Sequence, residues 1–60
     1  NMNSIPFQHN GTAYTVSTGF GEEIIINNTA EGTYQVFDVV DAPYEFDHVG
    51  MIALAIDLLS

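Results

Sequence analysis

Apolar and polar residues alternate in short runs along the chain as far as Val40, and this pattern predicts β-strands. The side chains of a strand point to opposite faces of a sheet in turn, so alternation indicates a strand with one buried side. We expect strands at residues 5–9, 12–16, 22–28 and 33–40, with turn-forming residues between them. Short strands at this spacing are typical of an antiparallel meander.

The first two expected strands are joined by Asn10-Gly11, the strongest short signal for a β-hairpin in the chain. A type I′ turn requires positive φ at both of its central residues, and Asn and Gly tolerate this conformation best. Pro6 lacks a backbone N–H, so the strand that contains it should lie at an edge of the sheet.

The later strands carry apolar residues on both sides. Ile24 and Ile26 share one side of the third strand and Ile25 occupies the other, as in a strand covered on both faces. The fourth strand places Phe37 and Val39 on one side and, on the other, Tyr34, Val36, Asp38 and Val40. Residues 28–36 resemble the Gly-Thr-Tyr-x-Val strand entry of many bacterial β-sandwich modules, and this local resemblance implies a turn followed by a strand.

The tail, residues 50–60, fits either a helix or a strand. A helix would place small or polar residues on one stripe, namely Gly50, Ala53, Asp57 and Ser60. A strand would place Ile52, Leu54, Ile56 and Leu58 on one face. Met, Ala and Leu are strong helix formers, so we favour a helix, with Asp47 near its N-cap. The expected fold is mainly β, a small antiparallel meander of about four strands with an apolar C-terminal helix (α+β) packed on the sheet or on a partner chain.

The length and composition of the chain make its core marginal. Sixty residues are enough for one domain, which we place at residues 1–60. A chain of this size buries only about 60% of the surface that it exposes when unfolded. It contains no Cys, so neither disulfides nor a thiolate metal site can add stability. Small chains without such links often rely on a partner, and we expect a homo-oligomer or a subunit of a complex.

The charge balance narrows the class of partner. Eight acidic residues and no Lys or Arg give a formal net charge of −8. Binding to nucleic acid or to an anionic membrane surface depends on basic residues, so the composition argues against both. The longest apolar run, residues 49–59, is too short to cross a bilayer and contains Asp57, which argues against membrane insertion. A protein partner with a basic surface fits the charge best.

Acidic residues concentrate between the last expected strand and the tail, and they are the candidate metal ligands. They are Asp38, Asp41, Glu45 and Asp47. Calcium is bound by six to eight oxygens, and this spacing does not match the common calcium-binding loop. We therefore interpret the segment as a charged connection. A weak calcium or magnesium site is the alternative, and no other cofactor is expected.

No arrangement of residues indicates catalysis. Ser4, Ser17 and Ser60 carry none of the local motifs of a Ser nucleophile, and so short a chain cannot readily enclose a cleft that excludes water. We expect a non-enzymatic binding or assembly module, a small acidic structural subunit that self-associates or docks on a larger protein through a sheet edge or the tail. The expected contact residues of the tail are Met51, Ile52, Leu54, Ile56, Asp57 and Leu58. The alternative is a calcium-dependent binding module that uses the acidic residues 38–48.

Two Asn-X-Thr triplets bear on the compartment. Asn10-Gly11-Thr12 and Asn27-Asn28-Thr29 both fit N-glycosylation in a secreted protein. Turn chemistry accounts for each of them as well, and we prefer that interpretation. The sequence does not determine the compartment, although the triplets favour an extracellular or cell-surface location.

Overall fold

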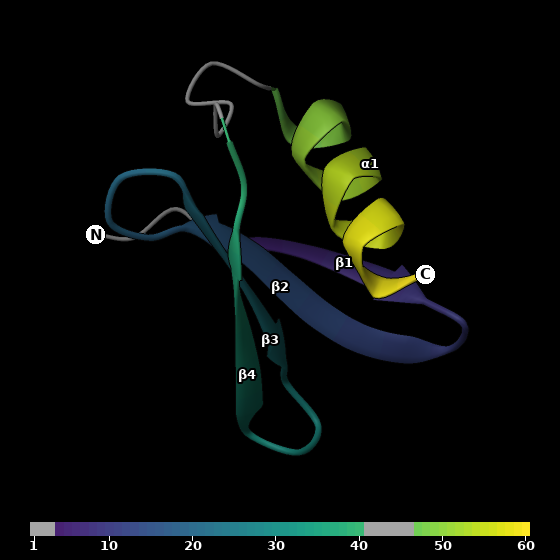
Figure 1. Ribbon diagram of the computed structural model, residues 1–60. Coiled ribbons are helices and arrows are strands. Elements are labelled where there is room, and N and C mark those ends of the chain that lie inside the picture. The colour runs from purple at the N-terminus through teal and green to yellow at the C-terminus, as the bar shows by residue number, and fades with distance from the viewer. Residues whose placement is uncertain (1–3, 41–46) are drawn as a thin grey trace.

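The structure is a computed structural model that describes residues 4–40 and 47–60. Within these residues the chain forms β1 (Ile5–His9), β2 (Thr12–Thr18), β3 (Glu23–Asn28), β4 (Thr33–Asp38) and α1 (His48–Leu59). Each strand pairs antiparallel with the next, so the sheet has the order β1-β2-β3-β4 (Figure 1). The predicted meander with a C-terminal helix is confirmed. β2 extends two residues further than expected, to Thr18, and β4 ends two residues earlier, at Asp38.

The β1–β2 hairpin turns at Asn10-Gly11, as predicted. Asn10 has φ of 52° and Gly11 has φ of 79°, the left-handed conformation that a type I′ turn requires. His9 pairs directly with Thr12, so the turn fixes the register of the whole hairpin. Pro6 lies in β1 at one edge of the sheet, which confirms its predicted position.

The β3–β4 hairpin is held by the side chain of Asn28. Its Oδ1 accepts hydrogen bonds from the backbone N–H groups of Ala30 and Glu31 at 3.1 and 3.2 Å. Gly32, at φ of 69°, donates its N–H to the carbonyl of Asn28 at 2.9 Å. Thr29 fastens the same turn to β2 by donating its hydroxyl to the carbonyl of Ala13. Asn28 and Thr29 thus perform the turn chemistry expected of the second triplet.

α1 begins at a side-chain cap and lies on one face of the sheet. Asp47 Oδ1 accepts the N–H of Gly50 at 2.8 Å, which confirms the predicted cap. The helix crosses β1 and β2 (Figure 1). Its stripe of Ala53 and Asp57 faces solvent, with Ser60 beyond it. The helix prediction for the tail is therefore correct.

The core lies between α1 and the face of the sheet that it covers. Its buried residues come from β1, β2, β3 and the helix, and they are Ile5, Phe7, Val16, Ile24, Ile26, Met51 and Ala55. Phe7 and Tyr14, direct cross-strand partners, stack with ring centroids 5.5 Å apart. Phe37 and Val39 pack against this cluster from β4 and the residue that follows it. Burial on this face is what holds the fold together.

The opposite face of the sheet, here called the open face, is covered by no element of the described residues (Figure 1). Ile25 lies on this face and is half-buried. The expectation that the third strand is covered on both faces is therefore wrong for the described chain, because α1 is the one helix and it lies on the other side. Ser17, the cross-strand partner of Ile25, is nevertheless buried.

Candidate functional site

β4 is the most exposed strand of the sheet and forms one of its edges. Five of its six residues are exposed, and Phe37 alone is half-buried, on the helix side. Two of the exposed residues, Tyr34 and Val36, are large and apolar, with 66% and 48% of their surface accessible to water. Large apolar side chains that stay exposed on an edge strand are typical of surfaces that bind another protein.

The open face collects the exposed apolar side chains of β4. Tyr34 and Val36 occupy alternate positions of the strand, opposite Asn27 and Ile25 of β3 in the register. Their side chains therefore share the open face with Ile25. Val40, two residues beyond β4, is 82% exposed, and Phe20, in the β2–β3 connection, is 94% exposed.

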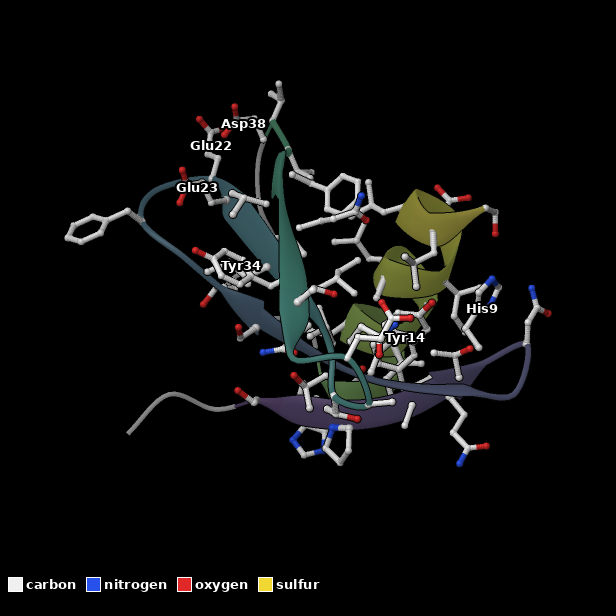
Figure 2. All side chains as sticks on the ribbon, turned by 90° about the horizontal axis from the view of Figure 1, so that it is seen from below. His9, Tyr14, Glu22, Glu23, Tyr34 and Asp38 are labelled. Carbon is white, nitrogen blue, oxygen red and sulfur yellow. The ribbon has the colours of Figure 1, made fainter. Side chains whose placement is uncertain are left out.

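Three carboxylates adjoin this apolar surface at one end of the sheet. Glu23 and Asp38 are direct cross-strand partners, so their side chains lie on the open face together. Figure 2 shows them with Glu22 at the same end, far from His9. They line a shallow hollow of about 260 Å³ together with Phe20, Val39 and Val40. The negative charge and the exposed apolar groups thus form one continuous surface.

The backbone holds this acidic end in place. Gly19 donates its N–H to the carbonyl of Glu23 at 2.8 Å, and Val39 donates to the carbonyl of Glu22 at 2.9 Å. A Cβ at Gly19 would lie 3.1 Å from both Glu23 Cβ and Ile25 Cδ1, so the connection passes close against β3. The carboxylates are therefore presented from an ordered connection and from paired strands.

The structure describes two of the four predicted metal ligands. Asp38 lies at the end of β4 and Asp47 caps α1, and both are exposed. Asp41 and Glu45 lie outside the described residues. Among residues 4–40 and 47–60, no group of three His, Asp or Glu side chains has the arrangement that could hold a metal ion. The calcium or magnesium site stays a prediction.

The predicted contact residues of the tail divide between the core and the surface. Met51 is buried in the chain's own core. Ile52, Leu54, Ile56 and Leu58 are half-buried and pack against that core, and Asp57 is exposed. The helix therefore uses part of its apolar surface to cover its own sheet, and part of these side chains remains accessible.

The acidic end of the open face is not among the sites predicted from the sequence. A signal for it was present, because a turn at residues 29–32 pairs Asn28 with Thr33 and, by counting outward, Glu23 with Asp38. Phe20 also carried a signal, because a large apolar residue between two glycines has little local structure to bury it.

Comparisons with known proteins do not assign this surface. The chain matches no protein-family profile, no curated protein and no solved structure. In the parts of the chain that the structure describes, no helix is long and apolar enough to span a bilayer. A functional assignment therefore depends on the geometry and charge of the chain itself.

Proposed function

We propose that this chain is a non-enzymatic binding and assembly module, a small acidic subunit that associates with protein through the open face and the edge of β4. The observation that carries the proposal is the exposure of Tyr34 and Val36 on an edge strand. A soluble domain usually limits its edges with charge, Pro or a covering element. β4 has neither Pro nor Lys, and its one charged residue, Asp38, is at its end.

Self-association is the simplest form of this activity. Burying two such faces against each other would remove Tyr34, Val36 and Ile25 from water. Full burial of an exposed apolar side chain contributes about 1.5–3 kcal/mol, and these partly exposed side chains would contribute less. The repulsion between chains that each carry a formal charge of −8 opposes this contact and is weakened by salt. Docking on a larger protein with a basic surface avoids that repulsion.

Sedimentation velocity on the parent chain and two variants tests the proposal. The double variant Tyr34→Thr/Val36→Thr keeps a strand-forming residue at each position but removes the apolar surface of the open face. Gln35→Thr, on the helix side of the same strand, is the matched control. We expect the parent and Gln35→Thr to associate, with themselves or with a basic protein, and the double variant to stay monomeric and folded. Association that the double variant retains would contradict the proposal.

The calcium-dependent alternative has one observation in its favour. Glu23 and Asp38 are like charges placed directly opposite each other, an arrangement that destabilises a sheet and that a bound cation would relieve. The alternative differs from the assembly proposal in one measurable way, because it requires a saturable response to calcium.

A further inference from the structure

We propose that the outer edge of β4, to which no strand of residues 4–40 or 47–60 is paired, accepts an extended basic segment of another protein, which adds to the sheet as an antiparallel strand. This inference rests on the proposed function and specifies its partner. Addition of a strand to a sheet edge uses backbone hydrogen bonds for affinity and alternate side chains for specificity. Both sets of groups can be identified on β4.

The direction of the backbone groups follows from the register and two hydrogen bonds. Val39 N–H donates to Glu22 toward β3, whereas the carbonyl of Glu23 accepts from Gly19 on the β2 side. In an antiparallel pair the hydrogen-bonding direction alternates along each strand. Residues 33, 35 and 37 therefore bond to β3, and the outward groups belong to Tyr34, Val36 and Asp38.

The other edge of the sheet is poorly suited to the same contact. The two-residue turn makes His9 and Thr12 a hydrogen-bonded pair, so Phe7 and Ile5 also bond toward β2. The outward positions of β1 are then Gln8 and Pro6, and Pro6 has no N–H to offer. α1 also packs on β1. Of the two edges, β4 is the one with a full set of outward donors and acceptors.

The outward positions of β4 also define the side chains of the partner. Tyr34, Val36 and Asp38 all project onto the open face, and Glu23 lies beside Asp38. A partner strand would place a Lys or Arg next to Asp38 and Glu23, and apolar or aromatic residues next to Val36 and Tyr34 at the following alternate positions. The fitting segment therefore reads basic-x-apolar-x-aromatic in the antiparallel direction.

Charge favours such a segment over a second copy of this chain. A second copy has no Lys or Arg and a formal charge of −8, so it can neutralise none of the carboxylates at the acidic end. A basic strand meets Glu23 and Asp38 with opposite charge and is attracted to the whole molecule. Salt also distinguishes the two occupants. Screening weakens the attraction of a basic segment, so its binding should weaken, and it weakens the repulsion between two copies of this chain, so their association should strengthen.

Peptide binding to the unmodified chain tests the proposal. The probe is a fluorescent extended peptide in which Lys, Val and Tyr alternate with Thr, and its control carries Glu in place of Lys. Two further versions carry N-methyl groups on alternate residues, so that one set blocks the backbone donors facing β4 and the other set blocks those facing away. We expect fluorescence anisotropy to show that the Lys peptide binds. The affinity should fall about tenfold or more for the Glu peptide. It should fall by a similar factor for the methylated version whose blocked donors face β4, and not for the other version.

A protein variant and salt distinguish the possible failures. Val36→Pro removes one outward N–H and spares the bonds to β3, so it should fold and lose peptide binding, whereas Gln35→Thr should keep it. Binding should also weaken as salt rises. Equal loss for both methylated peptides, or none, would overturn strand addition. A second outcome is that no peptide binds and the chain self-associates, more strongly in salt and not at all in Val36→Pro. That result would overturn the basic partner but keep the proposed function. Absence of any association would overturn both.

Discussion

At the scale of single residues, Asp47 has two predicted roles, as the N-cap of α1 and as a calcium ligand, and two substitutions test the first separately from the charge. Its side chain caps α1 through Gly50 N–H, and it was also a predicted calcium ligand. Asp47→Ala should lower the free energy of unfolding by about 1 kcal/mol, because the cap is lost. Asp47→Asn should cost much less, since Asn caps equally well. Urea titrations of both variants measure the difference, and equal losses would show that charge rather than capping matters here.

Gly11 is the second residue whose conformation makes a sharp prediction. Its φ is 79° and a Cβ there would meet nothing within 4 Å, so any cost of substitution comes from the backbone and not from a clash. Gly11→Val should destabilise the chain by about 1–2 kcal/mol, whereas Gly11→Asn should be tolerated better. Thermal melts followed by circular dichroism compare the two. An unchanged melting temperature in Gly11→Val would contradict the type I′ turn.

At the scale of elements, the two sides of β4 should differ in amide exchange. The N–H groups of Gln35 and Phe37 bond to β3, and those of Val36 and Asp38 point outward. Hydrogen exchange measured by NMR should therefore alternate along β4, slow at 35 and 37 and fast at 36 and 38. Uniform protection would indicate that another chain already occupies this edge under the conditions of the measurement.

The elements themselves were largely predictable from local signals. Asn10-Gly11, the turn at residues 29–32 and the residues of the tail each specify a local conformation, and together they determine the meander and the helix. What they do not determine is which face the helix covers. Each side of β4 and the residues that follow it carries one aromatic residue and one Val, namely Tyr34 and Val36 on one side and Phe37 and Val39 on the other. The placement of α1 on the second side leaves the first pair exposed. The candidate site is therefore a product of packing, which the pattern alone could not supply.

At the scale of the whole molecule, net charge should control self-association. The formal net charge is −8 at pH 7, and its magnitude decreases to zero near pH 4.1, the isoelectric point. As pH falls, the carboxylates take up protons and the repulsion between chains fades, so self-association should strengthen. Added salt at pH 7 should act in the same direction through screening. Sedimentation velocity at several pH values and salt concentrations checks this, and a flat response would contradict the role given to charge.

Calcium provides the test of the alternative function. On the assembly proposal, calcium at equal ionic strength should raise the melting temperature only modestly more than sodium does, because it acts on the acidic surface as a whole. A site among Asp38, Asp41, Glu45 and Asp47 should instead give a saturable rise that Asp41→Asn removes. Melting curves over a calcium series decide between these outcomes.

The packing of α1 on β1 has a consequence for how the chain folds as it is made. α1 (His48–Leu59) covers β1 (Ile5–His9), so the contacts that complete the core join residues that are far apart in the sequence. Such distant contacts slow folding, because closing the long intervening loop costs conformational entropy before the contacts compensate for it. On the ribosome, the meander emerges with Ile5, Phe7 and Val16 still uncovered, and the core can close only once residues 48–59 have left the exit tunnel. Until then the nascent chain presents apolar surface on both faces of its sheet.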